Sequence, residues 1–553
     1  MSLRSEPIGP VPEETARVAR AAFPRGTHWM RLRDELGVIY DDASFRPLFA
    51  VRGRPAEAPW RLALVSVMQF AERLSDRKAA DAVRGRIDWK YALGLPLADA
   101  GFDASVLCEF RARLIAGSQE QLLLEILLDL CWKRGWLAAR GRQRTDSTHV
   151  LAAIHGRNRA ETVRETMRHT LDVLAESVPA WLLAHIQSDW AERYQRGWDD
   201  DRLPSKQADR DALVAQVGAD GLALLMALYA EDAPPALRHL DAVQLLRQVW
   251  VQNYVPTQDG VRWRTPEDGL PPSRRFICSP YDPEAHYALK RASSWVGYKV
   301  HLTETCEPET PDLITDVATT LAPASDWEAT PVVHAALARR DLLPKEHLVD
   351  LGYVDADLLV SSQRDYGVDL VGPVRSDSHW QAQEQTGFAA EFFTIDWERQ
   401  QATCPAGRTS VSWTPVVDNR RTEVIKIRFS EKDCARCPHV QRCVRSTKKY
   451  PRRLVTVRRH AAYEALQSAR AREKTAAFKR AYAQRAGVEG TISQGVRTCG
   501  LRRTRYRGLA KTHLGHVLTA VGLNCLRIGD WLAGKARSAT QRSRFSRLLA
   551  LVT

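Results

Sequence analysis

The chain has 553 residues, which predicts three or four domains of about 150 residues each. Charged residues make up 26% and hydrophobic residues 44% of the sequence, so the composition excludes a disordered or fibrous protein. The formal net charge of +14, carried mostly by arginine, favours a polyanionic partner, nucleic acid before a membrane surface.

Secreted and membrane-spanning proteins are also disfavoured. Residues 1–10 lack the apolar segment of a signal peptide. The most apolar run, residues 122–132, is interrupted by Glu125 and Asp129 and is shorter than a membrane span. Ten cysteines in a chain of this length are too few for a disulfide scaffold. We therefore expect a cytoplasmic protein with reduced thiols and no membrane contact.

The first predicted unit, residues 1–140, is helical. Ser75 is the predicted N-cap of a helix over 76–84, and with the apolar helix before it this pattern resembles a helix-turn-helix. A further helix, "ASVLCEFRARL", is expected to carry Arg111 and Arg113 on its polar side. We expect a DNA-binding domain here; the alternative is a helical bundle with its arginines in solvent.

The remaining chain alternates between strands and helices. Asp146 lies in a predicted strand, and an apolar strand further along ends on Asp350. Between them "SSWVGYKVHLTET" and "DLITDVATTLA" predict a hairpin, and a helix is expected over 327–339. The fold class is therefore mixed, α+β or α/β. The predicted units after the first are a strand region at 141–156, a helical insertion at 157–275, a mixed-sheet core at 276–375, a β-rich insertion with cysteines at 376–458, and C-terminal helices with a basic tail at 459–553.

Three acidic residues lie where acids are unfavourable: Asp146 inside a strand, Asp350 at a strand end, and Glu489 on a helix in a basic region. Carboxylates that the fold brings together repel one another unless cations neutralise them. Two Mg²⁺ ions about 4 Å apart can activate a water or a 3′-hydroxyl group for phosphodiester chemistry. This spacing alone does not identify such a site, because single acids are common.

The motifs "RTDSTHVLAA", "SWVGYKVHLTET", "HLVDLGYVDADLL" and "YAQRAGVEGTISQGVR" occur in one order along the chain. Together they resemble the RNase H-like DDE transposases of bacterial insertion sequences, and most closely the group numbered eleven-eighty-two. The segment from "PAEAPWRLALVSVMQF" to "DWKYALGL" is similar to their InsH-type N-terminal domain. The resemblance spans residues 7–532.

The resemblance implies that Asp146 is the first catalytic acid, Asp350 the second and Glu489 the third. The family spacing Y-x2-R-x3-E fits Tyr482, Arg485 and Glu489. The family's lysine falls on Val496, with Arg497 one residue later, and this departure leaves open whether a hairpin intermediate forms. The implied cofactors are two Mg²⁺ per site, which Mn²⁺ can replace, bound by Asp146, Asp350 and Glu489.

The resemblance also implies the partners and the reaction. The N-terminal domain would bind the terminal inverted repeats of a mobile element, and the catalytic domain would cut and rejoin double-stranded DNA, including target DNA. Two ends must be handled together, so a homodimer on DNA is expected in the bacterial nucleoid. The alternatives are an inactive or domesticated DNA-binding protein, and an RNase H-like nuclease without strand transfer.

Several basic residues near Glu489 predict contacts with DNA phosphates. Arg485 lies four residues before Glu489 and would share its helix face; the alternative for this pair is a surface ion pair. The predicted DNA-binding residues are Tyr482, Arg485, Arg497, Arg502, Arg503, Arg505, Arg507 and Lys511.

Other acids and histidines compete with this assignment. Asp316 is the strongest competitor for the metal site, and Asp350 is preferred because it ends an apolar strand and fits the family's D-x-G-Y. Asp282 fits a turn before a proline, and Asp326 fits the N-cap of the following helix. The residues expected to be exposed are Glu304 and Asp355, and those expected to be structural are His149 and His301.

Four cysteines form the pattern C-x29-C-x2-C-x5-C at Cys404, Cys434, Cys437 and Cys443. Four thiolates can hold a structural Zn²⁺ ion. Because the sequence has only one C-x2-C pair here, reduced thiols without a metal remain the alternative.

Overall fold

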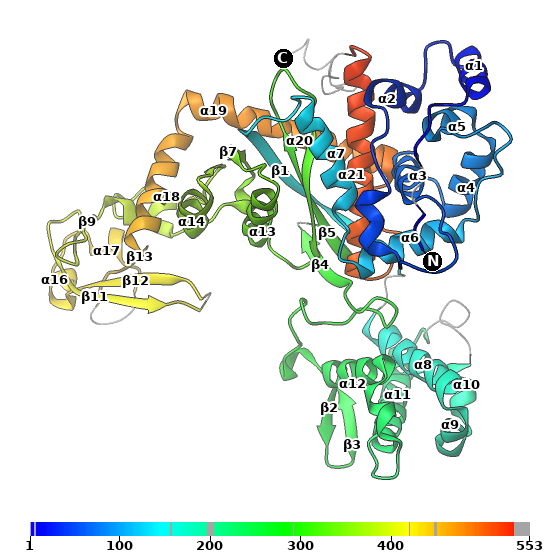
Figure 1. The fold of residues 1–553 in the computed structure, drawn as a ribbon. Helices are drawn as coiled ribbons and strands as arrows, with labels where there is room; N and C mark the ends of the chain where they lie inside the picture. The colour runs from blue at the N-terminus through cyan, green and yellow to red at the C-terminus, as the bar shows by residue number, and fades with distance from the viewer. Residues whose placement is uncertain are drawn as a thin grey trace, which may run out of the picture.

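The computed structural model describes residues 2–4, 7–154, 158–195, 204–290, 292–419, 421–446 and 451–535. Helices flank a curled, mixed sheet, so the chain combines α and β structure as the sequence predicts (Figure 1). The end of the predicted C-terminal unit, residues 536–553, lies outside the described residues.

The N-terminal region is helical, and α3 is its central helix. Every residue of α3 except Arg61 is buried, because the helix is apolar on nearly all its faces. Ser75 caps α4 by accepting a hydrogen bond from the N–H of Lys78, which confirms the predicted helix start. The helices are α1 (Glu13–Ala22), α2 (His28–Leu36), α3 (Pro59–Ala71), α4 (Asp76–Gly85), α5 (Ile87–Leu93), α6 (Ser105–Ala116) and α7 (Leu122–Lys133).

Arg111 of α6 does not face solvent, so the prediction for this residue is wrong. Its guanidinium is 6% exposed and lies 2.5 Å from the carboxylate of Asp76. A buried arginine requires such a partner, and the pair joins α6 to α4. Arg113 is half-buried and lies over the ring of Phe49.

A six-stranded sheet forms the centre of the molecule. Its central strand, β1, pairs antiparallel with β5 and parallel with β7. The outer edge of β5 pairs with both β4 and β6, and β8 pairs parallel with β7. The predicted hairpin is therefore confirmed as β5 and β6. The strands are β1 (Arg140–Leu151), β4 (His286–Lys290), β5 (Ser293–Thr305), β6 (Ile314–Leu321), β7 (Pro344–Leu348) and β8 (Asp369–Val371).

Helices cover the sheet on both sides (Figure 1). α13 (Asp326–Arg339) and α14 (Ala356–Tyr366) lie on one side, and α21 (Leu509–Leu532) lies on the other with the N-terminal helices. One continuous hydrophobic core joins the N-terminal helices, β5, β6, α13 and α21. Asn524 of α21 is fully buried and pairs with both backbone groups of Ile314 in β6, at 2.8 and 2.9 Å.

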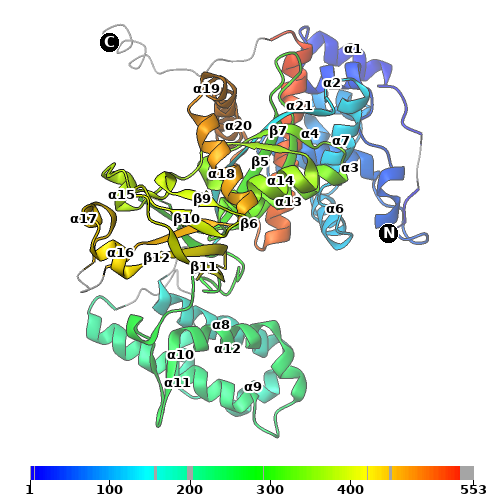
Figure 2. The same cartoon turned by 90° about the vertical axis from the view of Figure 1, so that its left-hand side faces the viewer.

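The helical insertion projects from one end of the sheet in both views (Figure 2). It has a hydrophobic core of its own, built around Trp190, Trp250 and Leu246. α11 is the one helix in the described part of the chain long and apolar enough to cross a membrane, a property that core helices of soluble proteins share. The elements are α8 (Arg159–Ser177), α9 (Pro179–His185), α10 (Trp190–Tyr194), α11 (Gln207–Leu228), α12 (Asp241–Asn253), β2 (Tyr254–Thr257) and β3 (Gly260–Trp263).

The β-rich segment also has its own hydrophobic core, around Ile427, Phe429 and Phe393. It lies across the sheet from the N-terminal helices in Figure 1. Its elements are α15 (Trp380–Gln383), β9 (Thr394–Asp396), β10 (Gln401–Thr403), β11 (Ser410–Val417), β12 (Glu423–Phe429), α16 (Glu431–Ala435), α17 (Val440–Cys443) and β13 (Leu454–Arg458).

After this segment the chain returns to the central sheet. α18 (His460–Glu473) packs on α14, and α20 (Gly487–Gln494) rests on β1 and β5. Between them lie α19 (Ala476–Ala483) and a 3₁₀ turn, Gln484–Ala486. A π-helical turn, Gly495–Cys499, follows α20. This path brings residues 482–502 beside β1, the strand that carries Asp146.

Candidate active site

Asp146 lies in β1 and faces the C-terminal segment. Side chains alternate between the two faces of a strand, so Arg144, Asp146 and Thr148 share a face, and each contacts residues 484–502. Asp146 is 14% exposed, and one of its carboxylate oxygens accepts a hydrogen bond from the N–H of Ser147 at 2.8 Å.

Asp350 follows the neighbouring strand. β7 ends at Leu348, two residues earlier than the sequence pattern predicts, because Asp350 instead caps a 3₁₀ turn, Leu351–Tyr353. Its Oδ1 accepts a hydrogen bond from the N–H of Gly352 at 2.8 Å. Since β1 and β7 are parallel neighbours, their carboxyl ends meet at the same edge of the sheet. Arg144 pairs with Leu348 in this register, so Asp350, two residues after β7 ends, lies level with Asp146 on β1.

A single guanidinium group joins the three acids. Nη2 of Arg485 lies 2.7 Å from Oδ2 of Asp146 and 4.0 Å from Oδ2 of Asp350. Nη1 of the same residue donates to Oε1 of Glu489 at 2.7 Å. Arg485 is 13% exposed, and its Nε is buried without a hydrogen-bond partner. The structure thus brings Asp146, Asp350 and Glu489 together around Arg485. The alternative, a surface ion pair between Arg485 and Glu489 alone, does not account for the contacts with the two aspartates.

The charges of this cluster are interdependent. Burial raises the pKa of Asp146 above its ordinary value, and although Arg485 and the N–H of Ser147 oppose this, Asp350 adds to it. Burial also lowers the pKa of Arg485, but the carboxylates around it, Asp146 first, raise the pKa above its ordinary value. The positive charge of Arg485 therefore favours the ionised form of Asp146 against its burial.

The donor set suits a divalent cation. Carboxylate oxygens are the protein ligands that Mg²⁺ prefers, and here three of them surround one positive group. As the side chains stand, Arg485 supplies that charge. Among the residues that the structure describes, no group of three or more His, Cys, Asp or Glu side chains is arranged to hold a metal ion.

A pocket of about 320 Å³ opens beside the acids. Two predicted DNA-binding residues, Arg497 and Arg502, line it together with Asp146 and Glu489. Arg502 donates through Nε to the hydroxyl of Thr148 at 2.9 Å. The acids and the basic side chains therefore share one opening, which could receive a phosphodiester.

Arg497 and Val496 lie in the π-helical turn after α20. A π-helical turn holds one residue more than an α-helical turn and often marks a functional site. Both residues line the pocket beside the acids, and Arg497 is exposed. The extra residue shifts the helical register by one position. The shift occurs where the family's lysine position falls on Val496 and the next residue is Arg497.

Tyr482 lies one turn before Arg485 and stacks on Phe478, with ring centroids 5.4 Å apart. Burial raises the pKa of Tyr482 and the charge of Arg485 opposes this shift, so its phenol lies near the acid cluster. The ring is half-buried and contacts the small core under β7 and β8.

The basic loop after α20 is held against the end of β1. The N–H of Leu151 donates to the carbonyl of Arg502, and the N–H of Thr504 donates to the carbonyl of Leu151. Arg503 and Arg505 are exposed and line a second pocket of about 190 Å³ with Arg73 of the N-terminal region. Exposed side chains also include Arg507, over the ring of Tyr281, and Lys511.

The strongest competing acid lies elsewhere. Asp316 of β6 is buried and pairs with Arg340 at 2.8 Å, not with the Arg485 cluster. Asp282 lies in the predicted turn before a proline, but it is buried and accepts a hydrogen bond from the hydroxyl of Tyr298 at 2.6 Å. These partners give both acids structural roles.

Two predictions of exposed or capping acids are wrong. Glu304 is fully buried, because its cross-strand neighbour Arg144 and a second arginine neutralise it. Asp326 is the first residue of α13 rather than its N-cap, which is Ser325. Asp355, predicted to be exposed, caps α14 and pairs with an arginine, with 36% of its side chain exposed.

Sequence reasoning also missed a polar group beside Asp350. Lys299 of β5 lies 3.1 Å from Oδ1 of Asp326, and the hydroxyl of Ser147 donates to the same oxygen at 3.2 Å. A Cβ added at Gly352 would lie 3.0 Å from Asp350 and 3.1 Å from Asp326, so these two acids border the same turn. No sequence spacing signals this contact, which depends on the approach of α13 to the sheet.

His149 on β1 and His301 on β5 both contact neighbouring side chains. His301 is buried and shares hydrogen bonds with the hydroxyls of Tyr353 and Thr320, and burial lowers its pKa to about 4. His149 lies against the ring of Trp295. Their contacts agree with the structural roles predicted for them.

The four cysteines of the β-rich segment line one cavity of about 30 Å³. Backbone N–H groups of Arg408 and Arg453 donate to the sulfurs of Cys404 and Cys434, at 3.4 and 3.5 Å. Burial raises the pKa of Cys443 to about 11. The thiols converge but do not form a metal-binding arrangement in this structure, so both zinc and reduced thiols remain predictions for Cys404, Cys434, Cys437 and Cys443.

Two families match separate parts of the chain. Residues 18–113, from α1 to α6, match a family described as Transposase domain (DUF772). Residues 403–528, which include Tyr482, Arg485 and Glu489, match a family described as Transposase DDE domain. Both descriptions are of transposase domains, and neither match covers half of the chain. No curated protein matches the sequence.

These matches indicate a transposase, and transposase domains act on DNA. The DDE match indicates an enzyme of the nuclease or transposase kind. It includes Glu489 but begins after both Asp146 and Asp350. The contact of Arg485 with all three acids therefore links the matched segment to the strands that precede it.

Proposed function

We propose that this protein cuts and rejoins DNA at Asp146, Asp350 and Glu489, as a cut-and-paste transposase of an insertion sequence. The observation that carries the proposal is the single guanidinium of Arg485, which lies within 4.0 Å of all three carboxylates. The transposase domain matches support the class of reaction.

The strand order supports an RNase H-like catalytic core. An antiparallel β1–β5–β6 unit is followed by two strands parallel to β1, in the spatial order β6–β5–β1–β7–β8. The proposed units are the N-terminal domain at 1–140, the first strand region at 141–156, the core at 276–375 and the C-terminal helices at 459–553, with insertions at 157–275 and 376–458. The eleven-eighty-two group and an InsH-type N-terminal domain are part of this proposal.

Asp146, Asp350 and Glu489 would hold two Mg²⁺ ions, or Mn²⁺ in their place. Bound there, the metals would supply an acidified nucleophile and stabilise the leaving oxygen. Arg485 would then hold the scissile phosphate or a neighbouring one. Arg497 would take the place of the family's lysine, because the π-helical turn shifts the register by one residue.

The DNA partners in this proposal are terminal inverted repeats and target DNA. Exposed basic side chains around the acid site provide phosphate contacts, and a homodimer would hold two ends together in the bacterial cytoplasm. The competing functions are a nuclease without strand transfer and a DNA-binding relic. All three acids are present and clustered, which favours an active enzyme over the relic.

The test uses the full chain and a labelled duplex taken from the boundary of the inverted repeats that flank the gene. With Mg²⁺, the wild type should nick the boundary, EDTA should prevent the nick, and Asp146→Asn should bind the duplex without cutting it. Joining of the released end to target DNA separates a transposase from a nuclease. Binding without cleavage under all conditions, including with both ends present, would support the DNA-binding relic instead.

A further inference from the structure

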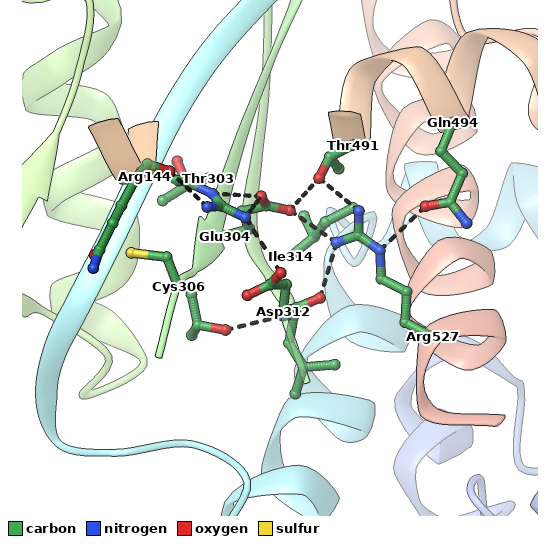
Figure 3. Close-up of polar contacts among 12 residues, drawn as sticks. Arg144, Thr303, Glu304, Cys306, Asp312, Ile314, Thr491, Gln494 and Arg527 are labelled. Carbon is green, nitrogen blue, oxygen red and sulfur yellow. Dashed lines mark hydrogen bonds and ion pairs between the residues drawn. The ribbon is translucent and has the colours of Figure 1, made fainter. Parts of the chain in front are cut away.

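A buried network of ion pairs and hydrogen bonds is centred on Glu304 (Figure 3). Arg144 donates through Nε to Oε1 of Glu304 at 2.7 Å, and its Nη2 forms an ion pair with the same oxygen at 2.7 Å. Oε2 accepts from Arg527 at 2.8 Å and from the hydroxyl of Thr491 at 2.5 Å. The network thus joins β1, β5, α20 and α21 at one carboxylate.

Glu304 remains ionised in this position. Burial raises the pKa of a carboxyl group, but Arg527 and Arg144 hold the pKa of Glu304 below its ordinary value. Arg144 also lies 3.3 Å from Asp312, and Arg527 donates to the carbonyl of Asp312 at 2.8 Å. Because both arginines have acceptors on two elements, neither can move without leaving a buried charge unpaired.

The same network holds the segment that carries Arg485 and Glu489. Arg144 donates through Nη1 to the carbonyl of Gln484 at 2.7 Å, one residue before Arg485. Thr491, two residues after Glu489, contacts both Glu304 and Arg527 at 2.5 Å. The two anchors therefore bracket the part of the chain that faces Asp146 and Asp350.

A glycine permits this close contact. A Cβ added at Gly487 would overlap the guanidinium of Arg144, whereas a Cβ added at Gly490 on the same helix would meet nothing within 4 Å. Gly487 has no positive φ, so the backbone conformation does not require glycine there. The approach of Arg144 to the helix is what excludes a side chain.

We propose that Glu304, with Arg144 and Thr491, is a positioning residue that sets where α20 presents Glu489 to the metal site. Glu304 is fully buried, so its effect passes through Thr491 and, by way of Arg144, through the carbonyl of Gln484. The inference rests on the proposed role of Glu489 as a metal ligand. Residues that orient metal ligands commonly change metal affinity or activity by about 10- to 100-fold when replaced.

The first test compares two alanine substitutions on α20 in the full chain. Both Gly487→Ala and Gly490→Ala raise intrinsic helix propensity, so a purely local effect would slow amide exchange in α20 equally. The proposal instead predicts that Gly487→Ala speeds hydrogen–deuterium exchange over residues 487–494 and raises the Mg²⁺ concentration for half-maximal cleavage about tenfold. Gly490→Ala should neither speed exchange over these residues nor raise the Mg²⁺ concentration for half-maximal cleavage.

The second test removes only a hydroxyl group. Thr491→Val should speed exchange in α20 and raise the Mg²⁺ requirement, while Thr491→Ser, which keeps the hydroxyl, should restore both to wild-type values. If Gly487→Ala and Thr491→Val match their controls in exchange and in Mg²⁺ requirement, the proposal is overturned.

The two readouts separate this inference from the proposed function. If the wild type shows no metal-dependent cleavage, the proposed function fails, while the exchange comparison still decides whether the network holds α20. If cleavage is normal but exchange and Mg²⁺ requirement do not respond to the variants, the function stands and the positioning role of Glu304 is overturned.

Discussion

Arg485 is the residue on which the acid site depends. Its guanidinium contacts Asp146 and Glu489 at 2.7 Å and lies 4.0 Å from Asp350. Three clustered carboxylates repel one another strongly when no cation lies between them. In the structure, this arginine performs the neutralising role that the proposal assigns to metal ions during the reaction.

Asp350 and Asp316 can be told apart by one pair of substitutions. Asp350→Asn should abolish cleavage while the fold is kept, because the residue is partly exposed and its hydrogen bond from Gly352 can be accepted by an amide oxygen. Asp316→Asn should instead cost about 1 to 3 kcal/mol of stability, since it removes the buried one of the two carboxylates that pair with Arg340 and leaves Glu125 as the other. Thermal unfolding and a cleavage assay on both variants check this, and Mg²⁺-dependent cleavage by Asp350→Asn would transfer the second acid to Asp316.

Glu304 should make stability depend on acid pH. Its folded-state pKa lies below the ordinary value of 4.5. The ionised carboxylate therefore stabilises the fold above about pH 4.5, and this contribution disappears as the pH falls through the lower folded-state pKa. The gap in melting temperature between wild type and Glu304→Gln should be widest near neutral pH and should narrow below pH 4.5. A gap that stays constant down to pH 3 would show that the charge of Glu304 does not stabilise the fold.

At the scale of elements, the C-terminal segment and β1 form one surface. The basic loop adds backbone hydrogen bonds at Leu151, where β1 ends, and places its arginines beside the acid pocket. A phosphate backbone that reaches Asp146 would therefore pass these arginines. This arrangement predicts a strong dependence of DNA binding on salt.

The role of each pocket arginine can be measured through that salt dependence. Replacing Arg497 or Arg503 by alanine should reduce the slope of log Kobs against log salt by about 1 for each phosphate that the variant no longer neutralises. Arg399→Ala serves as the control, because this exposed residue lies in the β-rich segment, away from the acids. Binding titrations at several salt concentrations measure the slope, and equal slopes for all three variants would place the DNA elsewhere.

The cysteine cavity offers a separate prediction. Without a metal, burial keeps the thiol of Cys443 protonated, since its pKa is about 11. A rotation of the four side chains into their shared cavity would allow one Zn²⁺ ion per chain, and metal analysis should find it in the wild type but not in Cys434→Ser/Cys437→Ser. Cys108→Ser, on the exposed face of α6, is the control. A zinc-free wild type would show that the four cysteines are reduced thiols without a metal.

Local sequence signals predicted the elements that carry the site. β-Compatible threonine and valine residues predicted β1, and two strand-like segments separated by a turn predicted β5 and β6. The Ser75 cap and the apolar spacing predicted α3 and α4. The same reasoning failed for Glu304 and Arg111, both of which are charged residues that a distant partner neutralises. A sequence shows a charge but not its partner, so buried ion pairs between remote segments cannot be predicted from local patterns.

At the scale of the whole molecule, the two insertions account for the long sequence distance between Asp146 and Glu489. Two insertions with cores of their own separate Asp146 from the core strands and Asp350 from Glu489. α21 then packs against both the N-terminal helices and β6, within one continuous core. α21 is thereby packed on the N-terminal helices, and α20 is held on the central strand β1.

The central claim, that Asp146, Asp350 and Glu489 form one divalent-metal site, can be tested without knowing the DNA ends. Fe²⁺ bound in place of Mg²⁺ reduces added hydrogen peroxide to hydroxide and a hydroxyl radical, and added ascorbate returns the iron to Fe²⁺. The radicals cut the polypeptide close to the metal, and mass spectrometry locates the breaks. A site at the three acids predicts breaks around residues 146, 350 and 489, suppressed by excess Mg²⁺ and absent in Asp146→Asn. Breaks confined to other segments, such as the strand of Asp316, or no localised breaks at all, would contradict it.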